Sequence, residues 1–251
     1  MIANLFVHQS AAQRYASARP YFHQLVTEAI SAFTRVSEFS CALDVGCGTG
    51  QSARALTDIA ETVNAIDISP EMIGETEHHN RVHYQVASAE NMPFEDDSFQ
   101  LLTAGLAFHW FDQSAFLTEA RRVLQSGGWL VVYNSFFKGK MIENDSFKEW
   151  ALGVYPQRFP KPPRHAEGIR DENIDPFGFK LKGHEKFTHD EVMSVAQLVE
   201  YLLTHTNVIA MVESGSTPLD DAASWITSSV TPFFQAERGT MQFGGDIWYL
   251  R

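Results

Sequence analysis

The sequence has few cysteines, few basic residues and no long apolar segment. Of its 251 residues only Cys41 and Cys47 are cysteine, too few for a disulfide framework, and no further Cys/His pair completes a zinc site. Reduced thiols are typical of a cytoplasmic protein, and we expect that location. No apolar run reaches the roughly 18–20 residues that cross a bilayer, and residues 1–20 lack the basic start and apolar core of a signal peptide.

The charge balance is acidic. The chain carries 31 Asp and Glu against 19 Lys and Arg, a formal net charge of -12. A protein that binds the phosphate backbone needs a basic face, so this balance argues against nucleic acid as a partner. A small molecule is the expected partner, with no membrane association. The sequence does not indicate an oligomeric state.

Apolar runs of strand length alternate with helical patterns over residues 41–135. This alternation predicts an α/β protein with a doubly wound, mostly parallel sheet and helices on both faces, whose ligands bind beyond the carboxyl ends of the strands. The helix before the sheet opens at Pro20, and a later one is capped by Asp112 or Ser114 and ends at Gly127. The strands are expected at 41–45, 62–68, 81–87, 99–105 and 129–135, and further helices at 51–60 and from Pro70.

This rhythm breaks after residue 135. Residues 136–176 are rich in aromatic residues and proline, and we interpret them as a lid inserted after the fifth strand, over the ligand edge. A strand is expected at 179–187, then a helix that opens with a capping box of Thr188 and Glu191, and a closing strand at the end of the chain. The predicted organisation is one domain, with N-terminal helices and core at 1–135, the insertion at 136–176, and the rest of the core at 177–251.

The stretch "LDVGCGTG" places three glycines, Gly46, Gly48 and Gly50, between a strand and a helix. Glycines there allow a tight turn and let a ligand lie against the backbone. The spacing is G-x-G-x-G, because Gln51 stands where the dinucleotide fingerprint has its third glycine. Asp44 beside the turn suits a cationic or hydroxyl-bearing ligand better than a phosphate.

A second acid, Asp67, ends the next predicted strand, 17 residues after Gly50. A carboxylate at this position can accept hydrogen bonds from both hydroxyls of a ribose. Ile68 and Met72 follow it and are candidates to flank a flat base. The alternative for Asp67 taken alone is a helix cap, since "DISPEM" leads into a helix.

Together these segments resemble the class I S-adenosylmethionine-dependent methyltransferases, in particular the small-molecule group that includes the ubiquinone/menaquinone-biosynthesis and trans-aconitate methyltransferases. The resemblance implies a seven-stranded sheet with an antiparallel last strand, S-adenosylmethionine as cofactor and no metal. It places "LDVGCGTG" under the methionine part of the cofactor with Asp44 near the amino group, and Asp67 on the ribose. "VASAENMPFEDDSFQLL" is similar to the adenine-contacting segment, where Ala89 offers its backbone N–H.

The chain departs from that family at two positions. Ser88 stands where an Asp often accepts a hydrogen bond from the adenine amino group, and Gln100 stands where Asp is common. A serine can accept a hydrogen bond but brings no charge, so we expect a weaker or displaced contact. The cofactor contacts implied by the resemblance are Tyr15, Arg19, Asp44, Gly46, Cys47, Gly48, Gly50, Asp67, Ile68, Met72, Ser88, Ala89, Glu90, Ala104 and Leu106.

Two flanking motifs resemble the trans-aconitate-like group. "YASARP" carries Tyr15 and Arg19, which in that group close over the cofactor, with the arginine near its carboxylate. "AFHWFD" places His109 and Trp110 just past the fourth strand, and we assign these two as catalytic candidates. His109 is suited to act as a general base at neutral pH. The alternative, which we favour, is that His109 and Trp110 only line the pocket.

The predicted activity is methyl transfer from S-adenosylmethionine to a small-molecule acceptor, with an organic acid as the hypothesis. Basic side chains of the insertion could pair with such an acid, and its aromatic residues could instead form an apolar site. The alternatives are a non-catalytic sensor of S-adenosylmethionine or S-adenosylhomocysteine, a modified form of the cofactor, and an NAD-dependent oxidoreductase, which the glycine spacing disfavours. The basic residues concerned are Lys138, Lys140, Arg158, Lys161 and Arg164.

Overall fold

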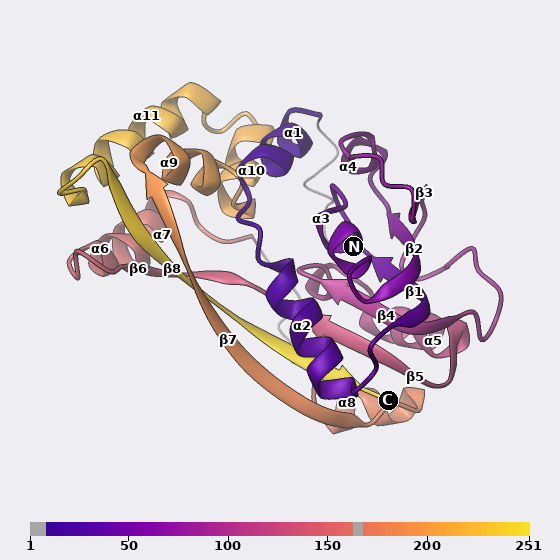
Figure 1. The fold of residues 1–251 in the computed structure, drawn as a ribbon. Coiled ribbons are helices and arrows are strands. Elements are labelled where there is room, and N and C mark those ends of the chain that lie inside the picture. The colour runs from indigo at the N-terminus through magenta and orange to yellow at the C-terminus, as the bar shows by residue number, and fades with distance from the viewer. Residues whose placement is uncertain (1–8, 163–167) are drawn as a thin grey trace. The chain divides into compact units, whose positions relative to one another are not determined.

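The computed structural model describes residues 9–162 and 168–251 and divides the chain into two compact units (Figure 1). We call them the sheet unit and the helical unit and describe each by itself. The sheet unit is made of Tyr21–Asn134, Arg164–Lys186 and Gly245–Arg251. The helical unit is made of Met1–Pro20, Ser135–Pro163 and Phe187–Gly244.

The sheet unit is built on five parallel strands in the order β3-β2-β1-β4-β5. The end of β8 runs antiparallel to β5, with Leu130 opposite Leu250 and Tyr133 opposite Ile247, and β7 pairs with β8. The predicted seven-stranded, mostly parallel sheet with an antiparallel last strand is therefore confirmed. These seven strands are β1 (Phe39–Val45), β2 (Ala60–Asp67), β3 (Val82–Val86), β4 (Phe99–Gly105), β5 (Leu124–Tyr133), β7 (Leu181–Ser194) and β8 (Arg238–Leu250). An eighth strand, β6 (Phe136–Met141), is added to the predicted set and pairs with β8.

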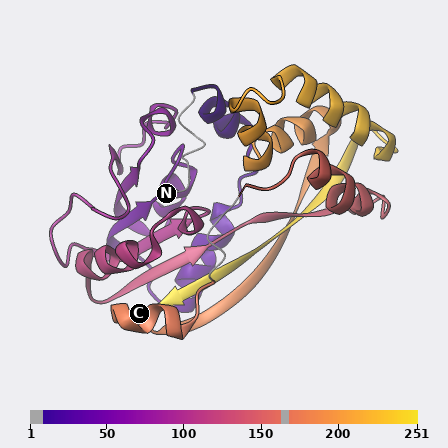
Figure 2. The same ribbon diagram turned by 180° about the vertical axis from the view of Figure 1, so that it is seen from behind.

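Helices cover both faces of these strands because the central strands are apolar on both sides. In β1 and in β4 five of the seven residues are buried, in an unbroken run of four, the pattern of a parallel strand between two helical layers. Figures 1 and 2 show α2 (His23–Thr34) over one face and α5 (Gln113–Val123) over the other. Phe116 and Ala120 of α5 pack in one cluster with sheet residues such as Leu43.

The helix boundaries differ from the sequence expectation at several ends. Asp112 caps α5, and its Oδ1 accepts from the Ala115 amide at 3.1 Å. The helix ends at Val123 and not at Gly127, because β5 already starts at Leu124 and pairs with Phe99. The remaining helices of this unit begin and end as follows: α2 starts at His23 and not at Pro20, α3 is Gln51–Leu56, α4 is Pro70–Gly74, α8 is Asp171–Ile174, and η1 and η3 are short 3₁₀ turns at Phe108–Trp110 and Asp175–Phe177.

The helical unit surrounds an aromatic core of its own. β6 (Phe136–Met141) pairs antiparallel with the first half of β8, with Phe136 opposite Gly244. Phe147, Trp150 and Phe243 are among the buried residues of its core. Its helices are α1 (Gln9–Ala18), α6 (Phe147–Glu149), the π-helix η2 (Trp150–Val154), α7 (Tyr155–Arg158), α9 (Val195–Leu203), α10 (Thr206–Glu213), α11 (Leu219–Val230) and the 3₁₀ turn η4 (Thr231–Phe233).

The predicted capping box at Thr188 and Glu191 is wrong. Both residues lie within β7, which continues to Ser194. The box forms six residues later, where the Ser194 hydroxyl accepts from the Gln197 amide and the Gln197 side chain accepts from the Ser194 amide. The chain offers both signals, and pairing of β7 with β8 decides between them, since a residue in a ladder cannot start a helix.

The two units do not follow the predicted segments 1–135, 136–176 and 177–251. The helical unit contains the start of the insertion, but it also contains α1 and residues 187–244, which fall in the predicted core segments. Whether the whole chain acts as one domain stays a prediction. Among the described residues, no single helix is long and apolar enough to cross a membrane; α9 and α10 together reach that length and composition but are bent by 67° at the break between them.

Candidate nucleoside site at the carboxyl ends of the strands

The glycine loop between β1 and α3 has a backbone that side chains disfavour. Gly46, Gly48 and Gly50 all have positive φ, at 71°, 54° and 80°. A side chain in this region costs about 1–2 kcal/mol, so glycine is the residue that fits all three positions. The loop is anchored to β2, because the Gly46 and Cys47 amides donate to the Ile66 carbonyl at 2.8 and 3.0 Å.

Close packing adds a second requirement for glycine. A Cβ on Gly46 would lie 2.5 Å from the Ala107 Cβ, and one on Gly50 would lie 2.6 Å from the Tyr84 hydroxyl. Such distances are well inside van der Waals contact, so the neighbouring segment would have to move. The loop is therefore held between the turn after β4 and the side chain of Tyr84 on β3.

Asp67 joins the end of β2 to this loop. One carboxylate oxygen accepts from the Gly48 amide at 2.8 Å and the other from the Ser69 amide at 2.9 Å. Burial raises the pKa of Asp67, and these amide hydrogen bonds oppose the rise. A carboxylate oxygen can accept more than one hydrogen bond, so both oxygens keep capacity for a pair of vicinal hydroxyls. The cap of α4 is Ser69, whose hydroxyl accepts from the Met72 amide, so Asp67 is not that cap.

Asp44 is more deeply buried than the sequence suggests. Its side chain has no exposed surface, and its two oxygens accept from the Ser52 and Thr103 hydroxyls at 2.5 and 2.7 Å. Burial raises the pKa of Asp44 to about 6, although both hydroxyl hydrogen bonds lower it. Asp44 thus braces α3 and β4 against β1. Its predicted place beside the amino group of a ligand stays a prediction.

The two residues predicted to flank a base have different surroundings. Ile68 is 59% exposed directly after Asp67. Met72 is buried, and its Cε lies 3.0 Å from the position of a Cβ on Gly48. Ile68 therefore offers an apolar surface beside the carboxylate, whereas Met72 packs against the glycine loop at Gly48. The buried thiol of Cys47 lies in the same loop, and burial raises its pKa well above the usual range.

Ser88 and Glu90 form a small network after β3. The Glu90 amide donates to the Ser88 hydroxyl at 3.1 Å, and that hydroxyl donates to the Glu90 carboxylate. The other Glu90 oxygen accepts from the Asp112 amide at 3.0 Å. The negative charge that an Asp would bring to position 88 is thus supplied by Glu90, whose carboxylate is hydrogen-bonded to Ser88. Ala89, between them, is buried, and its contact with an adenine ring stays a prediction.

The turn after β4 carries the candidate catalytic residues. Ala104 is fully buried in the strand, and Leu106 has a positive φ of 58°, which a leucine rarely adopts. Strain of this kind concentrates at ligand sites. The chain then enters η1, where the rings of His109 and Trp110 lie with centroids 4.8 Å apart, both half-buried. The two candidate residues therefore lie in a short helix that begins two residues after the strained Leu106.

Sequence reasoning missed one pair at this edge. The Tyr133 hydroxyl, at the end of β5, lies 3.0 Å from His23 Nδ1 at the start of α2, and both side chains are buried. Burial, with a contribution from Arg54, lowers the pKa of His23 to about 3, so its ring is neutral. The sequence offered only a weak signal for this pair: His23 stands at the start of one apolar pattern, that of α2, and Tyr133 at the end of another, that of β5.

Tyr15 and Arg19 belong to the helical unit. The Arg19 guanidinium lies over the Tyr15 ring at 4.6 Å and the Tyr201 ring at 5.4 Å, and it donates to the Thr204 carbonyl at 3.0 Å. These contacts are cation–π and hydrogen-bond contacts within that unit. The predicted roles of Tyr15 and Arg19 at the cofactor stay predictions.

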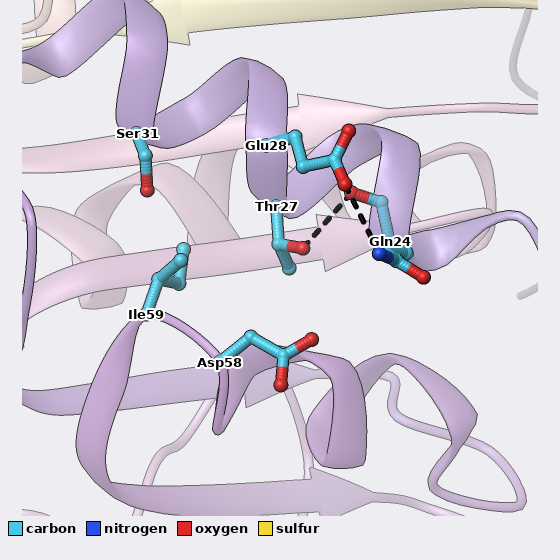
Figure 3. Close-up of a pocket in the computed structure, with 6 residues that line it drawn as sticks. All are labelled: Gln24, Thr27, Glu28, Ser31, Asp58 and Ile59. Carbon is cyan, nitrogen blue, oxygen red and sulfur yellow. Dashed lines mark hydrogen bonds between the residues drawn. The ribbon is translucent and has the colours of Figure 1, made fainter.

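A separate cavity of about 500 Å³ lies away from these strand ends, between α2 and the turn before β2 (Figure 3). Gln24, Glu28 and Asp58 are among its polar lining residues, and Gln24 already donates to Glu28 at 3.0 Å. β2 starts at Ala60, so this cavity lies at the amino edge of the sheet, opposite the carboxyl ends at which ligands of such folds bind. Within residues 9–162 and 168–251, no group of three or more His, Cys, Asp and Glu side chains could hold a metal ion.

Comparison with known proteins assigns part of the chain to a family. Residues 43–132 match the family model described as "Methyltransferase domain", the segment that contains the glycine loop, Asp67 and the turn after β4. The chain is 29% identical to a malonyl-[acyl-carrier protein] O-methyltransferase of Erwinia billingiae over 61% of this chain and 62% of that protein. It is 30% identical to a demethylmenaquinone methyltransferase of Staphylococcus haemolyticus over 57% of this chain and 65% of that protein. In other curated matches the chain spans about half the length of the relative, 48% in two cases.

A solved structure agrees with the fold. The structure of a proposed type II methyltransferase from Anaeromyxobacter dehalogenans superposes with a TM-score of 0.71 over 92% of this chain and 97% of that one, at 24% identity. At this identity the likeness shows the fold alone.

Proposed function

We propose that this protein, whose residues 43–132 form a class I S-adenosylmethionine-dependent methyltransferase domain, transfers a methyl group from S-adenosylmethionine to a small-molecule acceptor. The observation that carries the proposal is the hydrogen bond from the Gly48 amide to Asp67, which brings the glycine loop and a carboxylate together in one site. A nucleoside joined through sulfur to an amino acid, with no phosphate group, fits this site better than a dinucleotide does, because a carboxylate repels a pyrophosphate.

The residues of the sheet unit fit such a ligand. Asp67 would hold the two ribose hydroxyls, Ile68 would cover one face of the base, and the loop from Gly46 to Gly50 would lie against the amino-acid part. When bound, S-adenosylmethionine supplies an electrophilic methyl on a sulfonium. The protein's contribution is to align the acceptor in line with that methyl and to exclude water, and positioning of this kind can lower a barrier by about 7–11 kcal/mol.

We further propose that the acceptor is a small organic acid. One relative is named for a malonyl group, which carries a carboxylate. An ionised carboxylate is already a nucleophile and needs no general base, which accords with His109 and Trp110 acting as pocket wall. On the helical unit, Lys138, Arg158 and Lys161 are exposed; Lys140 is half-buried, and Arg164 lies outside the described residues.

The aromatic residues of the insertion support this choice indirectly. Phe147, Trp150, Tyr155 and Phe159 are buried in the core of the helical unit, where they pack against one another. They are thus used for folding, which weakens the alternative that they shape an apolar acceptor site. Phe136 is the exception, at 49% exposed.

Calorimetry with S-adenosylhomocysteine, S-adenosylmethionine and NADH tests the cofactor. We expect micromolar binding of the first two and a loss of at least about 30-fold in Asp67→Asn, since two charge-assisted hydrogen bonds are worth about 2 kcal/mol or more. Asp58→Asn, an exposed carboxylate of the same unit, is the matched control and should bind as the unchanged protein does. Binding of NADH alone would contradict the proposal.

A turnover assay then separates the enzyme from a non-catalytic sensor. The protein is incubated with S-adenosylmethionine and a panel of mono- and dicarboxylic acids, and S-adenosylhomocysteine is quantified. Acid-dependent product supports the acceptor class, and a raised acceptor KM in Arg158→Ala, against Arg170→Ala as control, would assign Arg158 to it. Binding without product from any acceptor, acids and quinols included, would favour the sensor.

A further inference from the structure

The His23–Tyr133 pair joins the point where the chain enters the sheet unit to the point where it leaves that unit. His23 follows the passage of the chain into this unit after Pro20, and Tyr133 precedes its passage out after Asn134. The hydrogen bond of 3.0 Å between His23 Nδ1 and the Tyr133 hydroxyl therefore fixes the start of α2 to the end of β5. The Phe22 ring stacks on His23 at 4.4 Å and closes this corner.

Tyr133 also controls the turn that leaves β4. Its ring fills the space where Gly105 would carry a side chain, since a Cβ there would lie 2.3 Å from the ring and 2.4 Å from the hydroxyl. Its carbonyl accepts from the Leu106 amide at 2.9 Å. Leu106 holds its positive φ of 58° between these two contacts. The strained turn is thus shaped by both the main chain and the ring of one residue.

This turn connects the two halves of the nucleoside site. Ala107, the next residue, lies against Gly46, where only 2.5 Å would separate its Cβ from an added Cβ. The Phe111 ring would lie 3.0 Å from the same added Cβ, and His109, in η1, lies between Ala107 and Phe111 in the sequence. A shift of the Leu106 turn would therefore move both the glycine loop and η1.

We propose that His23 and Tyr133 are positioning residues for methyl transfer, whose hydrogen bond fixes the Leu106 turn and through it the glycine loop. This inference rests on the proposed function. His23 is buried and neutral, so it acts as a hydrogen-bond partner and not as a proton carrier. Neither residue needs to touch a ligand, because each acts through Gly105, Leu106 and Ala107.

A double-mutant cycle on ligand affinity tests the pair. The affinity for S-adenosylhomocysteine is measured by calorimetry well below the melting temperature for Tyr133→Phe, His23→Leu and the double variant. Each single change should weaken binding by about 3- to 10-fold, the value of one net hydrogen bond, and the double variant should be no weaker than the singles. His23→Gln can still bond the hydroxyl and should stay within about 2-fold of the unchanged protein.

Tyr249→Phe is the matched control, since it removes a buried tyrosine's hydrogen bond to Glu185, of 2.7 Å, elsewhere in the same unit. It should lower the melting temperature and leave the affinity unchanged. Unchanged affinity in Tyr133→Phe and His23→Leu, or additive losses in the double variant, would overturn the inference and leave the proposed function standing. If Tyr133→Phe does not fold, His23→Leu and His23→Gln decide alone. No binding by the unchanged protein would overturn both.

Discussion

The nucleoside site has two halves, the ends of β1 and β2 and the ends of β4 and β5, and each half contains a polar side chain that is held in a different way: Asp67 by backbone amides, and Tyr133 by a side chain distant in the sequence. Asp67 accepts from the amides of Gly48 and Ser69, both within 19 residues of it. Tyr133 is bonded to His23, 110 residues away. A hydrogen bond donated by a backbone amide persists when neighbouring side chains are substituted, whereas a hydrogen bond between two side chains is lost when either partner is replaced. The glycine loop should therefore be most sensitive to changes that alter its backbone, and the second half to loss of either partner of the His23–Tyr133 pair.

The largest effect is expected from a backbone change in the first half. Gly46→Ala combines a positive φ, which costs about 1–2 kcal/mol, with a contact at 2.5 Å to Ala107, and overpacking costs about 1–3 kcal/mol. We expect a loss of about 2–5 kcal/mol in the free energy of unfolding, measured in urea. Gly74→Ala, where an added Cβ meets nothing within 4 Å, is the control and should lie within about 0.5 kcal/mol of the unchanged protein. Equal effects at both glycines would show that the close packing is not what matters.

The two halves also contain buried titratable groups with opposite pH dependence. The folded-state pKa of His23 is about 3 against 6.5, so the unfolded state binds the extra proton and stability is lost as pH falls from about 6.5 toward 3. The folded-state pKa of Asp44 is about 6 against 3.8, so the folded state binds the extra proton and stability is lost as pH rises from about 4 to 6. Between pH 4 and 6 these two contributions cancel.

Single substitutions should separate the two contributions. Relative to the unchanged protein, His23→Gln should make the free energy of unfolding fall with pH by about 1.4 kcal/mol per pH unit between pH 4 and 6, and Asp44→Asn should make it rise by about the same amount. Urea unfolding at half-unit pH steps measures both slopes. The double variant is the control, since it should restore the slope of the unchanged protein. Equal slopes in all four proteins would contradict the burial of these charges.

A smaller effect is expected where the two halves meet. Thr103 on β4 donates to Asp44 on β1 at 2.7 Å, within a buried network. Thr103→Val keeps the shape and removes this bond, and a hydrogen bond to a charged group contributes about 1.5–3 kcal/mol. We expect a loss near 1.5 kcal/mol at pH 8, because Ser52 still serves the carboxylate, and a smaller loss at pH 4, where Asp44 is protonated. Thr76→Val is the comparison, because its hydroxyl bonds only a nearby carbonyl in its own turn.

Much of the first half could be predicted from sequence because its signals are local. The glycine spacing requires a bare turn, and an apolar run on each side requires strands, so the loop and Asp67 follow from residues 41–72 alone. Where local signals conflicted, the prediction failed: Thr188 and Glu191 read as a helix start but lie in β7. The spacing placed Asp44 beside the turn, but it could not show that Ser52 and Thr103 enclose the carboxylate.

The sequence by itself determined a parallel α/β sheet with a glycine loop and an acid at the ends of its first two strands. Hydrophobic periodicity and glycine spacing are properties of residues that lie close together in the chain, so the structure that they favour can be predicted from the sequence alone. Only the tertiary structure decided that Tyr133 fills the space of Gly105, that His23 bonds Tyr133, and that Asp44 is sealed from solvent. These contacts join residues far apart in the chain, and packing of distant elements, which carries no local pattern, selects them.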